Sequence, residues 1–138
     1  MLKLVPYLSF NGQCEEAFKL YERCLGGKIT FMQTYGDSPM AEQTPTEWRK
    51  RVMHATLSVG DQLLQGSDSP PGQYQKPQGF SIAIALSDAT EAERIFKALS
   101  EDGKVQMPFQ PTFWAKGFGM LIDQFGTPWL VNAGQTAT

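Results

Sequence analysis

The 138-residue sequence predicts an α+β fold made of two similar modules, each with the order strand, helix and three further strands. Two amphipathic helices predict this, because their apolar positions match when the chain is shifted by 75 residues, as from Ala17 to Ala92. Short alternating segments before and after each helix are typical of strands. A segment rich in proline and glycine separates the two runs. We therefore expect a single domain, 1–138, with modules 1–69 and 79–138 joined by the linker 70–78.

The first module opens with the apolar run 5–10, which the pair Asn11-Gly12 ends. A helix is expected over 13–25, with Phe18 and Leu25 at the margin of its apolar stripe. The stripe itself recurs at helical spacing and consists of Ala17, Leu20, Tyr21 and Cys24. Gly26-Gly27 predicts the end of the helix, because glycine readily takes the left-handed conformation found there.

Three strands complete the first module. The segment 28–35 is the first, and a polar loop, 36–50, follows it. The second strand, 51–59, alternates, so that one face carries Met53, Ala55, Leu57 and Val59, and the other carries His54, Thr56 and Ser58. The turn Gly60-Asp61 leads into the third strand, 62–66, as a hairpin.

The second module repeats this order. After the strand 80–86, the Asp88-x-x-Glu91 pattern predicts a capping box that opens a helix ending near 101. The apolar stripe of this helix is Ala92, Ile95, Phe96 and Leu99. The remaining strands are expected at 104–109, 119–122 and 129–132, with a turn at 123–126. Trp129 is expected in the core, and Asp123 is expected to hydrogen-bond within its own turn.

Composition excludes several classes of protein. Hydrophobic residues make up 41% of the chain and charged residues 19%, a globular balance. The net charge of −2 argues against a nucleic-acid partner bound by phosphate neutralisation. No stretch supplies the roughly 20 apolar residues of a membrane span, and the beginning lacks the apolar centre of a signal peptide. We therefore expect a cytoplasmic protein without nucleic-acid or membrane partners.

The sequence lacks the patterns of the common catalytic classes. Cys14 and Cys24 lie on one predicted helix, about 15 Å apart, too far for a disulfide, and their spacing is not that of a zinc site. No glycine-rich phosphate loop is present, and the methyltransferase cofactor fold of alternating strands and helices is absent. His54 is the one histidine. Neither cysteine lies near a predicted base, so the sequence shows no pairing of a nucleophile with a base for nucleophilic catalysis.

Five segments together are typical of one superfamily. They are 6–10, the helix from Glu16 to Gly27, 52–55, 66–68, and the run from Thr112 to Trp129 with its tryptophans, glycines and Asp-x-Phe-Gly. On these segments the chain resembles the vicinal oxygen chelate superfamily, which includes glyoxalase I, bleomycin-resistance proteins and extradiol dioxygenases. It is most similar to the PhnB-like branch, also labelled demethylubiquinone methyltransferase-like.

The resemblance implies a glyoxalase/bleomycin-resistance-like fold, in which two βαβββ modules form a curved mixed sheet with a central cleft, usually within a homodimer. In metal-dependent members the cleft holds a divalent ion, bound by His and Glu. The matching positions here fall near Pro6 or Tyr7, Gln65, Ser81 and Leu130, which are poor metal ligands. We therefore expect no metal ligands at the usual place and no cofactor, with a divalent ion around His54 and Asp68 as the alternative.

The polar strand faces would line this cleft and supply the site. The expected ligand-binding residues are Tyr7, Ser9, Thr56, Ser58, Gln65, Ser81, Trp114 and Lys116. His54 is the catalytic candidate, as a general base, and the alternative is a structural histidine held by hydrogen bonds. Trp114 would wall the cleft or belong to the core. Lys116 would meet an anionic ligand or only solvent.

Three functions remain open at this point. The first is a metal-free protein that binds a small molecule in the cleft. The second is an enzyme of the same superfamily, of the metal-dependent lyase, isomerase or dioxygenase type or with His54 as its base. The third is a dimeric interaction module without a ligand.

Overall fold

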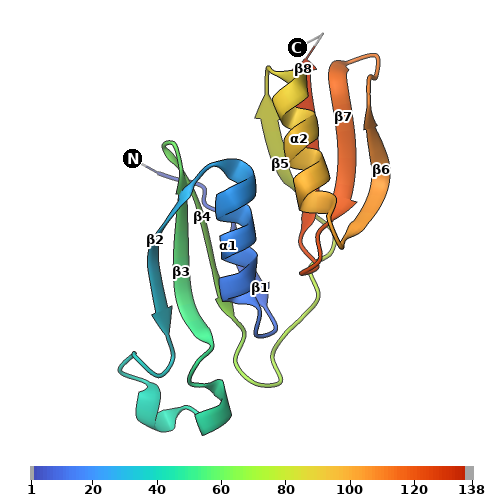
Figure 1. The fold of residues 1–138 in the computed structure, drawn as a ribbon. Helices are drawn as coiled ribbons and strands as arrows, with labels where there is room; N and C mark the ends of the chain where they lie inside the picture. Colours follow the sequence, from blue (N-terminus) through green and yellow to red (C-terminus); the bar gives the residue numbers. More distant parts are fainter. Residues whose placement is uncertain (1, 136–138) are drawn as a thin grey trace. The chain divides into compact units, whose positions relative to one another are not determined.

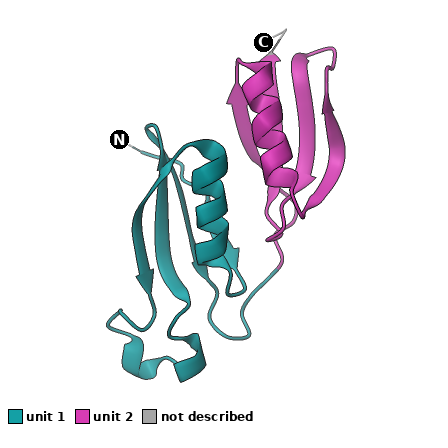
Figure 2. Cartoon of the chain, in the orientation of Figure 1, with its two compact units in different colours: residues 1–75 teal, residues 76–138 magenta. Residues whose placement is uncertain are grey.

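The computed structural model describes residues 2–135 and divides the chain into two compact units, residues 1–75 and 76–138 (Figures 1 and 2). Each unit has one helix on one face of a four-stranded sheet. The α+β class and the repeated order of one strand, a helix and three strands are confirmed. The units divide inside the expected linker, whereas the grouping of both modules into a single domain stays a prediction.

The first unit has the sheet order β1-β4-β3-β2, in which only β1 and β4 run parallel. Its elements are β1 (Tyr7–Phe10), α1 (Cys14–Leu25), β2 (Lys28–Thr34), β3 (Val52–Val59) and β4 (Gln62–Asp68). The expected polar loop contains two short 3₁₀ turns, η1 (Ala41–Gln43) and η2 (Thr46–Trp48). β4 continues beyond Gly66 to Asp68, because Ser9 and Phe10 of β1 pair with its last two residues.

The second unit has the same topology, with the order β5-β8-β7-β6. Its elements are β5 (Ile82–Leu86), α2 (Ala89–Ser100), β6 (Lys104–Gln110), β7 (Ala115–Ile122) and β8 (Pro128–Gln135). The expected start of β7 at Gly119 was wrong, since the strand begins four residues earlier, at Ala115. Gly117 lies outside the expected strand, but a side chain at Gly117 or Gly119 would collide with Phe109 or Phe96. They are glycines because the strand passes directly beneath these rings.

The core of the first unit lies between α1 and its sheet. The predicted helix stripe is buried, but the placement of Phe18 at its margin was wrong, because Phe18 is 0% exposed. Its ring lies against those of Phe10 and Tyr21, with centroids 6.2 and 6.0 Å away. The space for it comes from β4, where a side chain at Gly66 would meet the Phe18 ring at 2.9 Å. Because Gly66 is 48 residues away from Phe18 in the chain, the periodicity of the helix does not indicate this contact.

The alternation of β3 changes at its first residues. Gln33 pairs with His54 and Thr34 pairs with Val52, so that Met53 is the extra residue of a β-bulge. Val52 is consequently the buried residue at this end, at 1% exposed, in place of Met53, which the alternation had assigned to the apolar face. Beyond the bulge the prediction holds, since Ala55 and Leu57 are buried.

The buried carboxylate of Asp68 joins three segments of the first unit. Its Oδ1 accepts hydrogen bonds from the backbone N–H groups of Gly12 (2.8 Å) and Cys14 (3.0 Å), and its Oδ2 accepts one from Val52 (2.8 Å). The Tyr35 hydroxyl donates to the Asp68 carbonyl oxygen at 2.8 Å. Asp68 therefore fixes both the approach to α1 and the start of β3.

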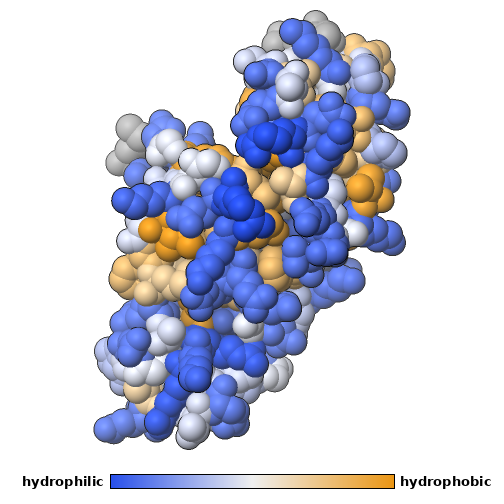
Figure 3. Space-filling view, in the orientation of Figure 1, coloured by the Kyte–Doolittle hydropathy of each residue, from blue (hydrophilic) through white to orange (hydrophobic). Residues whose placement is uncertain are grey.

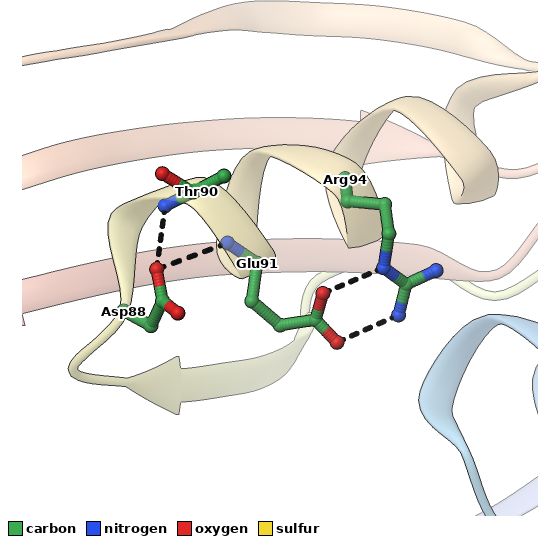
Figure 4. A network of polar contacts seen from close by, with 4 residues as sticks. All are labelled: Asp88, Thr90, Glu91 and Arg94. Carbon is green, nitrogen blue, oxygen red and sulfur yellow. Dashed lines mark hydrogen bonds and ion pairs between the residues drawn. The ribbon is translucent and has the colours of Figure 1, made fainter.

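The second helix begins with the predicted cap, although only half of the capping box forms. The Asp88 carboxylate accepts hydrogen bonds from the backbone of Thr90 and Glu91, at 2.9 and 3.2 Å (Figure 4). The Glu91 carboxylate turns instead to the Arg94 guanidinium, at 2.6 and 2.8 Å. The hydrogen bonds from Arg94, and secondarily its charge, lower the pKa of Glu91.

The outward sides of both helices are charged, and hydrophilic side chains cover much of the helix-bearing surface in Figure 3. Each helix carries an ion pair between residues one helical turn apart, Glu15–Lys19 on α1 and Glu93–Lys97 on α2. Within residues 2–135, neither helix is long and apolar enough to cross a membrane.

Replacement of Asp68 tests its role in the fold. Asp68→Asn places an amide N–H against backbone donors, and we expect the free energy of unfolding to fall by about 3 kcal/mol. Urea denaturation followed by circular dichroism measures this change. The control is Asp61→Asn, which removes the same charge at an exposed hairpin residue. Equal stabilities of the two variants would contradict the role given to Asp68.

Candidate functional site

Four of the predicted site residues form one hydrogen-bonded chain across three strands of the first sheet. The Tyr7 hydroxyl lies 3.1 Å from Nδ1 of His54, and the Thr56 hydroxyl lies 3.5 Å from Nε2. Gln65 donates from its side-chain amide to the Thr56 hydroxyl at 3.4 Å. The register explains the convergence, since Gln65 of β4 lies opposite both Tyr7 of β1 and Thr56 of β3. Both ring nitrogens of His54 therefore have a hydroxyl partner.

Two aromatic rings flank the histidine. The Tyr7 ring is stacked on the imidazole with centroids 5.7 Å apart, and the Phe31 ring lies 5.8 Å away on the β2 side. Tyr7 is 50% exposed and Phe31 47%. We call the face of this sheet opposite α1, which carries Tyr7, Phe31, His54, Thr56 and Gln65, the helix-free face. It combines polar groups with apolar rings, as small-molecule sites do.

The other two predicted residues of this unit lie outside the chain of hydrogen bonds. Ser9 is exposed on β1, two residues beyond Tyr7 and therefore on the same face. Ser58 donates its hydroxyl to the carbonyl oxygen of Gly60 at 3.2 Å, so its side chain serves the hairpin turn. The structure thus brings together four of the six site residues that were predicted in the first unit.

Sequence reasoning missed the contribution of β2. Phe31 and Gln33 lie opposite Thr56 and His54, and Gln33 donates to the Asp37 carbonyl oxygen at 3.2 Å. A second bulge, at Thr30, shifts the alternation of this strand. The pairing of β2 with β3 could have indicated these residues, because any residue directly opposite His54 or Thr56 lies on the same face of the sheet.

The three predicted residues of the second unit lie near two cavities of that unit or on an aromatic cluster. Ser81 lines a cavity of about 560 Å³ with Phe80, Gln106 and Pro128. Lys116 lines a cavity of about 230 Å³ that also borders Glu93. Trp114 is partly exposed and contacts Phe113 and Phe118 edge-on, with centroids 4.7 and 5.1 Å away.

The structural roles expected near the end of the chain are confirmed. Trp129 is 1% exposed, and its indole N–H donates to the Asp123 carboxylate at 2.8 Å. The same carboxylate accepts hydrogen bonds from the backbone of Phe125 and Thr127, at 2.8 and 3.0 Å. Asp123 is therefore the Asx-type organiser of its turn.

The two residues of the alternative metal site do not converge. Asp68 is buried on the helix-bearing side of the sheet, with both carboxylate oxygens accepting backbone hydrogen bonds. His54 lies on the helix-free face, and its two nitrogens face hydroxyl groups. Across residues 2–135, no three His, Cys, Asp or Glu side chains lie together in a group that fits a metal ion. A metal at His54 would have to displace Tyr7 or Thr56.

Cys14 is unsuited to nucleophilic catalysis. It is fully buried, and this burial, followed by the negative charges of Asp68 and Glu15, raises the pKa of its thiol far above the ordinary value. Cys24 is also buried, and neither residue forms a disulfide. Both occupy the core side of α1, where a thiol behaves as a small apolar group.

Residues 2–132 match the model of the family described as 3-demethylubiquinone-9 3-methyltransferase. The chain belongs to this family. It is also 33% identical to the protein YjdN of Escherichia coli K12 over 139 aligned residues, which cover 95% of each chain. The expected resemblance to the PhnB-like branch is confirmed.

Solved structures share this fold. The protein PA1353 from Pseudomonas aeruginosa is 48% identical, with a TM-score of 0.89 over 96% of this chain and 98% of that one. The PhnB protein from Bacillus cereus is 24% identical, with a TM-score of 0.80 over 96% and 99%. The fosfomycin resistance protein FosX from Listeria monocytogenes, at 8% identity, has a TM-score of 0.66 over 99% and 94%. The glyoxalase/bleomycin-resistance-like fold class is thus confirmed.

Thiol reactivity tests the role of Cys14. Because burial shields the Cys14 thiol from the reagent and raises its pKa, we expect it to react with 5,5′-dithiobis(2-nitrobenzoate) at least about a hundredfold more slowly in the native protein than in denaturant. Cys24→Ser isolates the signal of Cys14. Rapid labelling of the native Cys24→Ser protein at pH 7 would contradict this assignment.

Proposed function

We propose that this chain is a small-molecule binding protein whose ligand lies on the helix-free face of the first sheet, above His54. The observation that supports the proposal is the hydrogen-bonded chain of Tyr7, His54, Thr56 and Gln65. Side chains from three strands converge there on the face of the sheet that no helix covers. Structural polar networks are usually buried, whereas Tyr7 is half exposed.

The flanking rings give the proposed site its apolar part. A ligand that covers the exposed halves of Tyr7 and Phe31 would remove apolar surface from water, and the hydroxyl and amide groups would set its orientation. Binding without a metal is part of the same proposal, and the hydroxyl groups beside both nitrogens of His54 support it. Homodimer formation and a cytoplasmic location stay predictions.

Methyl transfer, the activity in the family's name, is not what we propose. Each unit is a mixed four-stranded sheet with one helix on one face. Binding of a nucleotide-like methyl donor is typical of parallel sheets with helices on both faces and a glycine-rich turn.

A fragment panel tests the proposal. We expect compounds that raise the melting temperature to shift the backbone amide signals of Tyr7, Thr56 and Gln65 in ¹H–¹⁵N spectra. Phe31→Ala should weaken their binding about tenfold through lost apolar contact. The control is Lys19→Gln, on the exposed side of α1, which should bind normally.

Two results would contradict this assignment. Shifts confined to the cavity near Ser81 or the one near Lys116 would move the site to the second unit. A panel without any hit would favour a ligand-free interaction module.

Metal analysis tests the metal-free part separately. Untagged protein grown with zinc, nickel, manganese and iron, then dialysed without chelator, should carry far less than one metal ion per chain by mass spectrometry. His54→Ala is the comparison. Near-stoichiometric metal that this variant loses would establish the enzyme alternative instead.

A further inference from the structure

The hydrogen bonds of His54 depend on its protonation state in a way that bears on the ligand. A neutral imidazole has one N–H and one bare nitrogen. With the proton on Nδ1, His54 donates to Tyr7 and accepts from Thr56, so only the Tyr7 hydroxyl proton is left for a ligand. With the proton on Nε2, the roles are exchanged and only the Thr56 proton is left. Gln65 donates to Thr56 in either case.

Protonation of His54 changes this count. The imidazolium has two N–H groups, and it donates to both hydroxyl oxygens. Tyr7 and Thr56 then each have a hydroxyl proton for an outside acceptor. The site gains a second donor and a positive charge in the same step. Histidine ordinarily changes its charge between about pH 5 and 8.

Within residues 2–135, no acidic side chain forms a hydrogen bond or ion pair with His54 that would offset this charge. The groups that face His54 are Tyr7 from β1, Phe31 and Gln33 from β2, Thr56 on β3 and, through Thr56, Gln65 from β4, and of these only Tyr7 is titratable. Among the described residues His54 takes part in none of the ion pairs, and Asp68 lies on the helix-bearing side of the sheet. The aromatic rings of Tyr7 and Phe31 lie beside the imidazole, with centroids 5.7 and 5.8 Å from its own. An anionic group on the ligand would supply the charge opposite to that of protonated His54.

We infer that the site recognises a ligand with an anionic oxygen group, of the carboxylate, sulfonate or phosphate class, and that it binds this group more tightly when His54 is protonated. The inference rests on the proposed function and names the ligand class for the same site. Tyr7 and Thr56 touch the ligand through their hydroxyl groups, and His54 acts through them as a positioning residue and as the charge.

A matched pair of probes tests the inference. Naphthalene-2-sulfonate keeps its negative charge at every pH used, and naphthalene-2-sulfonamide has the same rings without that charge. By calorimetry on the full chain, we expect the sulfonate to bind about tenfold more tightly at about pH 5.5 than at about pH 8, since a charge-assisted hydrogen bond replaces a neutral one. The sulfonamide should bind with the same affinity at both pH values.

Variants separate the roles of the three residues. His54→Gln should remove the pH dependence of sulfonate binding, and Lys19→Gln should keep it. Tyr7→Phe and Thr56→Val each remove one donor and should weaken sulfonate binding at low pH about fivefold. These two variants keep His54, so they remain informative if His54→Gln fails to fold.

The histidine itself provides a direct readout. Because the chain has one histidine, a long-range ¹H–¹⁵N spectrum contains one imidazole signal set. Saturating sulfonate should move the midpoint of the His54 titration to higher pH, by linkage with anion binding. The sulfonamide should leave it in place.

Three outcomes would overturn the inference. An affinity for the sulfonate that does not change with pH, or the same pH dependence for the sulfonate and the sulfonamide, would contradict the preference for an anion. Failure of the sulfonate to bind at low pH would remove the ligand class. In each case the proposed function stands if the fragment panel still maps to Tyr7, Thr56 and Gln65, and it falls with the inference if the panel maps elsewhere.

Discussion

The first unit depends on the hydrogen bonds of one buried carboxylate, that of Asp68. A buried anion is tolerated only when donors surround it, and here the backbone N–H groups of Gly12, Cys14 and Val52 do so. Gly12 lies in the turn before α1, Cys14 is the first residue of α1 and Val52 is the first residue of β3. The β-bulge at Met53 lies directly after Val52, and beyond it His54 is on the side of β3 opposite the buried Ala55 and Leu57. Asp68 thus holds the start of β3 two residues before His54, from the opposite side of the sheet.

The two units share a topology but use their polar residues differently. In the second unit Asp123 is the buried carboxylate, and it organises its own turn and the indole of Trp129, while Asp68 ties together segments distant in sequence. Only the first sheet carries a histidine, so only its helix-free face combines a titratable charge with hydroxyl groups. The histidine of the proposed site therefore lies in the first unit, whereas the second unit packs Trp129 in its core.

Much of the fold was predictable from local pattern. The helix stripes, the Asp88 cap and the glycines that end α1 and the β3–β4 hairpin all follow from interactions within a few residues. The errors share a different origin. Phe18, Val52 and the start of β7 depend on partners on other strands, where a missing side chain at Gly66, Gly117 or Gly119 creates space or a bulge shifts the alternation. Periodicity along one segment contains no information on such partners.

The sequence by itself determined the α+β class, the repeated element order, the family resemblance and the polar face of β3. It also placed Tyr7, His54, Thr56 and Gln65 among the site candidates. Only the tertiary structure decided that these four join in one chain of hydrogen bonds, that Phe31 belongs beside them and that Asp68 does not. Strand register brings about this selection, because pairing across β1, β4, β3 and β2 sets which side chains meet on a common face.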